Sequence, residues 1–528
     1  MTISKWMHVG TVLKMNAINY PDKLGWQDKS QEFTFKEWNE RSCRLSNGLK
    51  DLGVGHGGDN FAVMAYNRGE WMDIYASCAK GGQVIVPVSF RLAGPEIEYI
   101  LNHSECKGFI VETPFVGLIN SIKDKLPVPK DAYIYLGDGP VPEGYVGYGD
   151  LLDKSSPQEP DILVDAAHIW TIMYTSGTTG RPKGVMRTHE SNIAQYFVNN
   201  INMGVRPDDK VMLVMPMFHV NSIFYSFPYT LVSAPVFVYN MVSFDPEDLL
   251  RTIEKYKITF TSLVPTHYIM MLALPDEIKN SFDVSSIRQL LISSAPARKD
   301  LKLAIMEYFK NAKLWEAYGS TEGGLVTLLR PEDQFKKLGS IGKEVFGTDR
   351  IRVVDESRNE VPDGQVGELF YRTPMLFKEY LKEPEKTKEA FDNGWSSAGD
   401  MVVRDQDGYY TLVDRKANMI ITGGENVYPS EVENVVGAHK AVKDIAVIGI
   451  PDDKWGEAVK AVVVLHEGYE PAEELSKEII DFSRGKLAGY KRPKTVDFID
   501  DEEMPRTPTG KILHRLLRER YGTWREAH

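Results

Sequence analysis

Short runs of β-branched and other apolar residues alternate with longer helical patterns along most of this chain of 528 residues. Apolar runs bounded by turn residues are typical of strands buried on both faces of a sheet. Alternation of such strands with helices favours largely parallel sheets covered by helical layers. The candidate buried strands are Trp170–Thr175, Val211–Met215, Ile258–Val264 and Leu290–Ser293. The pattern therefore predicts an α/β fold.

The C-terminal part of the chain has the pattern of a second, smaller domain. Its candidate strands are Asp444–Ile450, Ala458–Leu465 and Thr495–Ile499, and its candidate amphipathic helix is Ala472–Leu487. Another helix is expected near Pro429, because Ser430 and Glu433 have capping-box spacing. We expect residues 1–415 to form the large N-terminal domain and residues 416–528 the small one.

Charge and cysteine content exclude some classes of protein. Lys and Arg number 62 and Asp and Glu 74, giving a net charge of −12 without a long like-charge block. Affinity for nucleic acid rests on clustered cations that neutralise phosphates, so no nucleic-acid partner is expected. Cys43, Cys78 and Cys106 are odd in number and lack metal-ligand spacing, which favours free thiols in a reducing compartment and predicts a cytoplasmic location.

The stretch Val211–Phe244 contains no Asp, Glu, Lys or Arg and is long enough to cross a bilayer. Prolines interrupt it at Pro216, Pro228 and Pro235, and a proline inside a helix removes a backbone hydrogen bond. We therefore expect interior strands and a buried helix here, and no integral membrane span.

The segment Tyr174–Val185 (YTSGTTGRPKGV) follows an apolar strand and combines three glycines, four short hydroxyls and two cations. Glycines allow a tight turn whose N–H groups point inward, and Lys183 supplies positive charge, so the segment predicts a polyphosphate-binding loop. It is not a Walker A loop, because Pro182 stands where glycine is required and Gly184 follows the lysine in place of Ser or Thr.

Further motifs follow the loop: Ser293–Pro296, Tyr318–Glu322, Gly394–Asp400, Asp414–Ile420, Gly423–Pro429 and Pro505–Lys511. In this order and at these distances, they resemble the signature motifs of AMP-forming acyl-CoA synthetases. That superfamily of adenylate-forming enzymes also contains peptide-synthetase adenylation domains and beetle luciferase. The resemblance covers nearly the whole chain. It implies a large multi-layered N-terminal domain with mostly parallel sheets and a small mobile α+β C-terminal domain, which carries a catalytic lysine and part of a coenzyme A tunnel.

The resemblance also assigns roles to individual residues. ATP contacts fall on Thr175, Ser176, Gly177, Thr178, Thr179, Gly180, Lys183, Ser294, Ala295, Pro296, Glu316, Ala317, Tyr318, Gly319, Ser320 and Thr321. Asp400 would accept hydrogen bonds from the ribose hydroxyls, Arg415 would contact ribose or phosphate, and Gly423 and Gly424 would line the pantetheine tunnel. Glu322 and Thr178 would hold Mg²⁺. The residues expected to serve catalysis are Lys511, Thr178, Lys183, His219 and Glu322, with Lys511 bridging the attacking carboxylate and the α-phosphate.

The acyl pocket is expected to be formed by His219, Asn221, Tyr225, Ser293, Ala317, Gly323, Gly324 and Leu325. Three positions depart from the family pattern: Ser293 replaces a smaller residue, Ala398 replaces threonine, and Ala417 replaces the lysine or aspartate of the hinge. Peptide-synthetase domains usually carry aspartate where this chain has His219, which favours an acid without an α-amino group.

These features predict an acid–CoA ligase that uses ATP, Mg²⁺ and coenzyme A and passes through an acyl-adenylate. Within the family, the alternatives are a stand-alone enzyme that loads a carrier-protein thiol and a luciferase-like oxygenase. A nucleotide-binding regulator without turnover is the alternative from another class. The sequence leaves open which carboxylic acid is used and whether the chain forms a homodimer.

Overall fold

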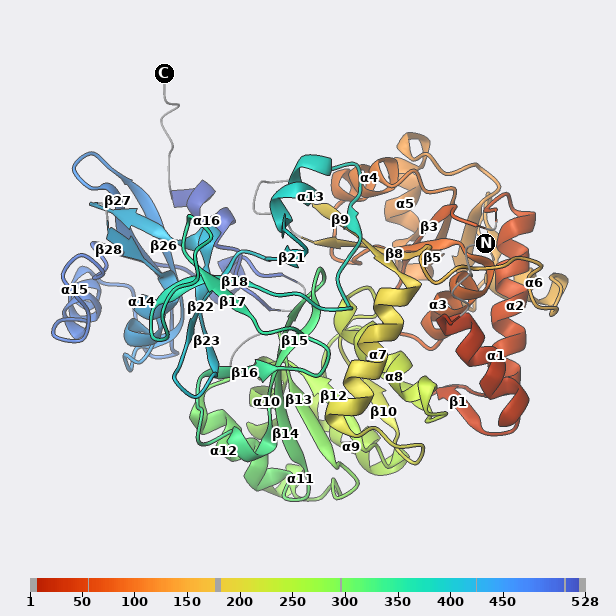
Figure 1. Ribbon diagram of the computed structural model, residues 1–528, viewed down its shortest axis with the longest axis horizontal. Helices are drawn as coiled ribbons and strands as arrows, with labels where there is room; N and C mark the ends of the chain where they lie inside the picture. The colour runs from red at the N-terminus through yellow and green to blue at the C-terminus, as the bar shows by residue number, and fades with distance from the viewer. Residues whose placement is uncertain are drawn as a thin grey trace. The chain divides into compact units, whose positions relative to one another are not determined.

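The computed structural model describes residues 7–55, 57–175, 182–294, 297–423, 425–507 and 510–521, and of Ala417 only the backbone. By contacts the chain divides into two compact units (Figure 1). Unit 1 comprises Met1–Ile351 and Tyr371–Ser396, and unit 2 comprises Arg352–Phe370 and Ser397–His528. This grouping does not locate a hinge, so the boundary expected after residue 415 stays a prediction.

One sheet of unit 1 follows the strand order β19-β9-β8-β4-β3-β5-β6-β7. Its strands from β8 to β7 pair in parallel, whereas β8, β9 and β19 pair antiparallel. The bounds are β19 (Glu379–Tyr380), β9 (Lys183–Thr188), β8 (Ile169–Thr175), β4 (Val84–Pro87), β3 (Asn60–Met64), β5 (Gly108–Glu112), β6 (Tyr133–Leu136) and β7 (Val146–Gly147).

The other sheet of unit 1 follows the order β16-β15-β14-β13-β12-β10-β11-β1-β2. Its central strands are parallel, and β14, β15 and β16 pair antiparallel at one side. The bounds are β16 (Ser340–Glu344), β15 (Gly324–Leu329), β14 (Lys313–Ser320), β13 (Gln289–Ile292), β12 (Phe260–Leu263), β10 (Val211–Leu213), β11 (Val236–Val238), β1 (Leu24–Gln27) and β2 (Glu32–Thr34). All four predicted strands of this domain are therefore confirmed.

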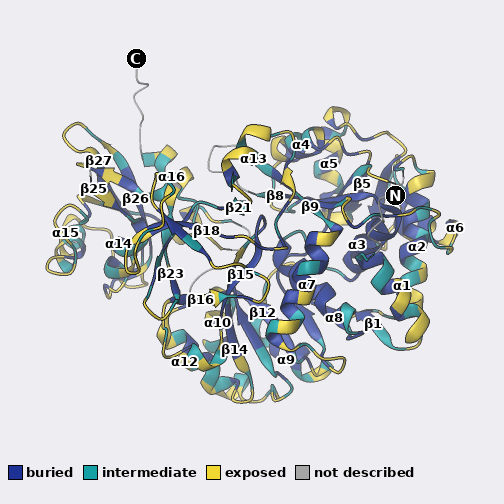
Figure 2. Cartoon of the chain, in the orientation of Figure 1, coloured by how far each residue is buried: buried dark blue, intermediate teal, exposed yellow. Residues whose placement is uncertain are grey.

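Alternating side chains of each sheet enter different cores of unit 1. In β3, Phe61 and Val63 pack into a large central core, while Ala62 and Met64 pack on the opposite face. Successive strand residues point to opposite faces, so helices must cover both sides. The central core is bounded by α1 (Val9–Asn19), α2 (Phe35–Asp51), α3 (Glu70–Gly81), α7 (His189–Met203) and α8 (Val220–Leu231); outer layers contain α4 (Gly94–His103), α5 (Val116–Ile122), α9 (Pro246–Tyr256), α10 (Pro265–Leu272) and α12 (Lys299–Tyr308). Figure 2 shows the buried strands within these layers, and the predicted layered α/β fold is confirmed.

The uncharged stretch Val211–Phe244 forms β10, α8 and β11, as predicted. Pro228 lies inside α8 and is buried, and the helix continues past it to Leu231. In the ranges described, no helix is both long enough and apolar enough to cross a membrane. The three cysteines are buried and free, and burial raises the pKa of the Cys43 thiol to about 12.

Unit 2 contains two sheets. The first is antiparallel, with β17 (Arg352–Val354), β18 (Val366–Phe370), β22 (Asp400–Arg404) and β23 (Tyr410–Arg415) as neighbours. The second has the order β25-β24-β27-β26, with β28 parallel to β27. Its strands are β25 (Glu425–Val427), β24 (Ile420–Thr422), β27 (Gly456–Leu465), β26 (Val442–Asp452) and β28 (Thr495–Phe498), which pack on α14 (Pro429–Val436) and α15 (Glu473–Phe482).

Two details of the predicted C-terminal helices were wrong. The capping box of α14 is not Ser430 with Glu433, because Pro429 occupies the first helical position, where its missing N–H costs nothing. Tyr428 is therefore the N-cap, and its N–H donates to Glu431 Oε1 at 3.1 Å. The predicted helix to Leu487 ends instead at Phe482, and Gly485 follows with φ of +72°.

Candidate functional site

The two ends of the predicted phosphate loop are the last residue of β8, Thr175, and the first residue of β9, Lys183. Thr175 pairs with Lys183 in the antiparallel register, so the strands bring the two ends of the loop together. The loop residues predicted to contact phosphate, Ser176, Gly177, Thr178, Thr179 and Gly180, lie outside the described residues. Thr178, the second predicted metal ligand, is among them.

Glu322 lies in the turn between β14 and β15 and is buried. The Tyr380 hydroxyl donates to Glu322 Oε1 at 2.9 Å, and the Phe377 N–H donates to the Glu322 carbonyl at 2.7 Å. Within the described ranges, no cationic side chain lies at ion-pair distance from this carboxylate. A buried carboxylate that also retains acceptor capacity fits a hard cation such as Mg²⁺.

Lys183 is joined to this carboxylate through the same tyrosine. Its Nζ lies 4.3 Å from the centroid of the Tyr380 ring, which is cation–π distance. Two residues predicted to serve catalysis, Lys183 and Glu322, therefore contact one aromatic side chain within unit 1. Nothing in the sequence signalled Tyr380.

Arg187 is a second residue that sequence analysis missed. It is fully buried in β9, and its Nη1 donates to the Thr321 carbonyl at 2.7 Å. Burial lowers the pKa of the guanidinium to about 10, against the raising effects of Tyr196, Glu322 and Tyr371, so the group stays charged at neutral pH. Arg187 thereby connects the strand that carries Lys183 to the turn that carries Glu322.

Glu316 was predicted to contact ATP, but its carboxylate is bonded inside the protein. It forms an ion pair with Lys302 of α12, and both residues are buried. The Ala297 N–H donates to Glu316 Oε1 at 3.4 Å, which ties β14 to the residue that follows the motif Ser293–Pro296. Of that segment, Ser294 is exposed with φ of +69°, and Ala295 and Pro296 lie outside the described residues.

The motif residues from Ala317 to Thr321 complete β14 and its turn. Tyr318 and Thr321 are buried, and the Ser320 hydroxyl lies 3.0 Å from the Tyr371 hydroxyl. A Cβ on Gly319 would lie 2.2 Å from the Gly324 carbonyl oxygen, so the two strands approach too closely for a side chain there. The motif's glycine is therefore required by packing.

Several predicted acyl-pocket residues form one buried polar network. Asn221 Nδ2 donates to Ser293 Oγ at 2.6 Å, and Ser293 Oγ lies 3.1 Å from Ser262 Oγ. Asn221 and Tyr225 are on α8, and His219 is its N-cap. Loss of hydration lowers the pKa of the His219 ring to about 4, so this ring is neutral at physiological pH.

The glycines predicted to line the acyl pocket are held against polar and aromatic neighbours. Gly323 leaves no space for a Cβ beside the Tyr371 ring, and Gly324 has φ of +71°. The Leu325 N–H donates to Gln195 Oε1 at 2.8 Å. Gln195, which the sequence did not indicate, therefore fixes the start of β15.

Unit 2 brings Asp400, Arg415 and Lys511 into one electrostatic neighbourhood. Asp400 is opposite Arg415 in the β22–β23 register, and Arg415 Nε lies 3.2 Å from Asp400 Oδ1. Although Lys511 as a whole is solvent-accessible, loss of hydration at its ammonium, followed by the charge of Arg415, lowers the Lys511 pKa to about 8 against the raising effects of Asp400 and Asp414.

The predicted tunnel glycine Gly423 has φ of +60°, and its N–H donates to the Trp455 carbonyl at 2.7 Å. A Cβ at this position would lie 2.8 Å from Trp455 Cε3. Gly424 lies outside the described residues. The predicted hinge position Ala417 falls in a single 3₁₀ turn, Lys416–Asn418.

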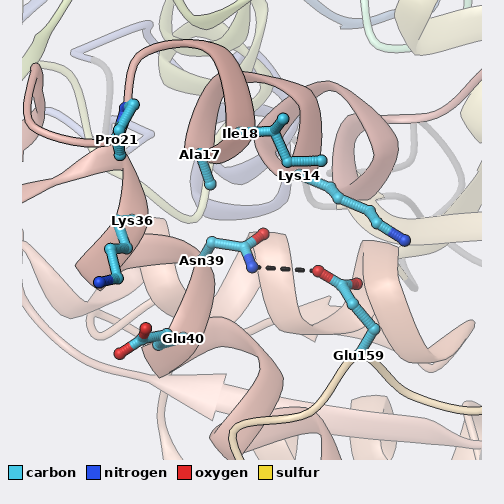
Figure 3. A pocket seen from close by; sticks show the side chains of 8 residues that line it. All are labelled: Lys14, Ala17, Ile18, Pro21, Lys36, Asn39, Glu40 and Glu159. Carbon is cyan, nitrogen blue, oxygen red and sulfur yellow. Dashed lines mark hydrogen bonds between the residues drawn. The ribbon is translucent and has the colours of Figure 1, made fainter.

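A surface hollow of about 450 Å³ lies elsewhere in unit 1 (Figure 3). Asn39 Nδ2 donates to Glu159 Oε1 at 3.0 Å beside it, and Lys80 pairs with the same carboxylate. Its lining residues are Lys14, Ala17, Ile18, Pro21, Lys36, Asn39, Glu40 and Glu159. None of the residues predicted for catalysis or binding is among them.

Comparisons with known proteins agree with these motifs. Residues 13–381 match the family model of the AMP-binding enzyme, and residues 431–511 match that of the AMP-binding enzyme C-terminal domain. The chain is 35% identical to a feruloyl-CoA synthase of Amycolatopsis sp, over 93% of this chain and 94% of the relative. It is 34% identical to a long-chain-fatty-acid–CoA ligase of Mycobacterium tuberculosis, over 97% and 98% of the two chains.

Among solved structures, the fold is similar to that of the anthranilate CoA ligase AuaEII in complex with anthranoyl-AMP. The TM-score is 0.87 at 29% identity, and 98% of each chain is covered. The predicted resemblance to AMP-forming acyl-CoA synthetases is thus confirmed along the chain. This chain belongs to the AMP-binding enzyme family.

Proposed function

We propose that this protein is an AMP-forming acid–CoA ligase that converts a carboxylic acid, ATP and coenzyme A into an acyl-CoA, AMP and pyrophosphate. The observation that carries the proposal is the connection of Lys183 and Glu322 through Tyr380 beside the phosphate loop. A loop-end cation and a buried carboxylate held together are the groups that a magnesium-bound triphosphate needs. The three buried free cysteines support a reducing, cytoplasmic location.

The reaction must join two anions, the substrate carboxylate and the α-phosphate, which repel each other. In the first half-reaction, a carboxylate oxygen attacks the α-phosphorus and the bond to pyrophosphate breaks. Lys183 and Lys511 would offset negative charge, and Glu322 would hold Mg²⁺, which supplies further charge neutralisation when bound. In unit 2, the acceptor-only carboxylate of Asp400 suits the ribose diol.

In the second half-reaction, the thiol sulfur of coenzyme A attacks the acyl carbonyl, the thiol proton is lost to solvent, and the bond to AMP breaks. Gly423 and Gly424 would lie along the pantetheine path, where the absence of a Cβ permits close approach. Residues 416–528 would move between the two half-reactions as a separate domain, as in other two-step enzymes that reposition groups by hinge motion.

The relatives support the reaction class and leave the acid open. Two of nearly equal identity are named for chemically different acids, an aromatic one and a long-chain aliphatic one. The Asn221–Ser293–Ser262 network places polar side chains among the residues expected to form the acyl pocket, which supports an acid that carries a polar group.

Exchange of labelled pyrophosphate into ATP, with a panel of aromatic and aliphatic acids, tests adenylate formation. Release of AMP with free coenzyme A, compared with a phosphopantetheinylated carrier protein, tests the acceptor. We expect exchange with at least one acid and AMP release with free coenzyme A. Absence of exchange with every acid, by a protein that still binds ATP, would instead favour the nucleotide-binding regulator.

A further inference from the structure

Tyr380 reaches the predicted phosphate site from a short strap far along the chain. The strap is β19, which pairs antiparallel with β9 so that Tyr380 lies opposite Val185. The Lys378 and Leu381 N–H groups donate to the Met186 and Gly184 carbonyls, each at 2.8 Å. The strap is therefore fixed across the strand that begins with Lys183.

Packing holds the Tyr380 ring in place. The residue is 4% exposed and belongs to a small apolar cluster with Val185, Phe377 and Ala390. The Phe377 ring lies 4.7 Å from the Tyr380 ring and stacks on Phe391. A side chain whose rotamer is fixed by packing can orient its hydrogen-bond partner at little entropic cost.

The hydroxyl and the face of this fixed ring each contact a group that the proposed reaction needs. The hydroxyl donates to Glu322 Oε1, a charge-assisted hydrogen bond at 2.9 Å, and Lys183 Nζ lies over the ring. The hydrogen bond uses one carboxylate oxygen, and a carboxylate offers about four acceptor sites, so a metal can bind at the same time. The Tyr380 side chain therefore contacts both the Glu322 carboxylate, through its hydroxyl, and the Lys183 ammonium, through its ring.

We propose that Tyr380 is a positioning residue that couples the phosphate-binding Lys183 to the magnesium-binding Glu322, with separate contributions from its hydroxyl and its ring. The proposal rests on the function proposed above and adds a residue to its nucleotide site. The hydroxyl orients the carboxylate and so contributes to ATP binding with Mg²⁺. The ring places the lysine and so contributes to ATP binding with or without Mg²⁺.

The alternative is that Tyr380 merely fills space in the apolar cluster. Under this alternative, removing the hydroxyl alone changes stability and leaves the magnesium dependence of ATP binding as it is. The variants Tyr380→Phe and Tyr380→Leu separate the two contributions, because the first keeps the ring and the second removes it. Tyr148→Phe is a matched control, since the buried Tyr148 hydroxyl also donates to a buried carboxylate, Asp73, at 3.3 Å.

Calorimetric titration of the full-length protein with ATP, in excess Mg²⁺ and in excess EDTA, gives a readout independent of turnover. For Tyr380→Phe we expect affinity to fall about tenfold in Mg²⁺ and to stay unchanged in EDTA, the size typical of losing a hydrogen bond to a charged group. For Tyr380→Leu we expect affinity to fall in both conditions. Tyr148→Phe should match the wild type in both.

Unchanged Mg²⁺-dependent affinity in Tyr380→Phe would overturn the proposal, and so would an equal loss with and without Mg²⁺. Thermal unfolding of each variant identifies loss by misfolding, and if Tyr380→Leu does not fold, Tyr380→Phe still decides the role of the hydroxyl. Failure of the proposed function is distinguishable, because it would appear as absent pyrophosphate exchange in the wild type whatever the titrations show.

Discussion

Lys302 and Glu316 form an ion pair in the interior of unit 1, where both side chains are almost fully shielded from solvent. Lys302 lies on α12 and Glu316 on β14, and the second carboxylate oxygen of Glu316 accepts from the Ala297 N–H at 3.4 Å. The pair therefore joins a helix, a strand and the residue that directly follows the predicted ATP contacts Ser294–Pro296.

Removing one partner of this pair should destabilise the protein strongly. Lys302→Met leaves a buried carboxylate without its cation, and Glu316→Leu leaves a buried ammonium, each at a cost of about 3–5 kcal/mol. The double variant should recover most of that loss, because two apolar side chains replace two charges. Thermal unfolding midpoints of the three variants check the expectation.

The double variant also isolates the hydrogen bond to Ala297. We expect its KM for ATP to rise several-fold while its KM for the acid stays unchanged, because Ala297 has lost the acceptor that holds its segment. Restored stability together with a normal KM for ATP would show that Glu316 only balances the charge of Lys302.

The strands and the motif positions were predictable because they depend on local pattern. Trp170–Thr175 lies within β8, because an apolar run bounded by turn residues is typical of a buried strand. Thr495–Ile499 closely matches β28, although that strand is only partly buried. The predicted capping box of α14 was wrong because two pairs have the required spacing, Tyr428 with Glu431 and Ser430 with Glu433. Pro429 at the first helical position makes Tyr428 the N-cap.

The residues that hold the motifs were not predictable, because their partners are distant in the chain. Arg187 bonds to a carbonyl 134 residues away, and Tyr380 to a carboxylate 58 residues away. No periodicity or spacing signals such a contact. The ion pair of Glu316 with Lys302 was not predictable for the same reason, because it joins α12 to β14, and the expected ATP contact of Glu316 stays a prediction.

Adenylate formation should fall as the pH rises through the pKa of Lys511. That pKa is lowered from 10.5 to about 8, so the ammonium is fully charged below pH 7 and increasingly neutral above pH 8. A neutral amine cannot offset the charge on the carboxylate and phosphate. The profile of kcat/KM for ATP, measured by pyrophosphate exchange, should therefore have an alkaline limb near pH 8.

The rate of thioester formation from pre-made acyl-AMP should instead rise with pH. A thiol becomes more nucleophilic as it ionises, with a pKa of about 8.5. Lys511→Ala should reduce exchange severely and spare this second half-reaction. Lys477→Ala, an exposed lysine on α15, serves as the control. Equal loss of both half-reactions in Lys511→Ala would contradict the role given to the lysine.

A side chain at position 423 should affect the second half-reaction more than the first. Gly423 has φ of +60°, which costs about 1–2 kcal/mol for other residues, and a Cβ would meet the Trp455 ring at 2.8 Å. In Gly423→Val we expect a lower rate of thioester formation from acyl-AMP and near-normal pyrophosphate exchange.

Trp455→Ala combined with Gly423→Val tests whether that loss arises from the clash between the residue at position 423 and the Trp455 ring, which lies between β26 and β27. If the double variant recovers coenzyme A kinetics, the clash explains the defect. If the loss persists, the valine itself obstructs the thiol path. Normal kinetics in Gly423→Val alone would remove Gly423 from the tunnel.

Ser293 should influence which acid is accepted and leave ATP binding unchanged. Its hydroxyl accepts from Asn221 Nδ2 at 2.6 Å and lies 3.1 Å from the Ser262 hydroxyl, so it sits at the middle of a buried polar chain. Ser293→Ala removes that acceptor and leaves the buried Asn221 amide without this hydrogen bond, which lowers the free energy of unfolding by about 1–3 kcal/mol.

In the presence of an acid with a suitably placed polar group, the freed Asn221 amide can bond to the substrate instead. We therefore expect Ser293→Ala to raise kcat/KM for polar acids about tenfold relative to apolar acids of similar size, with an unchanged KM for ATP. Kinetics with matched pairs of acids, such as an aromatic acid with and without a ring hydroxyl, measure the shift. Thr261→Val is the control, because the Thr261 hydroxyl donates to the Met212 carbonyl in the same sheet and does not join this chain. Parallel changes for both members of every pair would mean that Ser293 lies outside the acyl pocket and serves only the packing of β13 against α8.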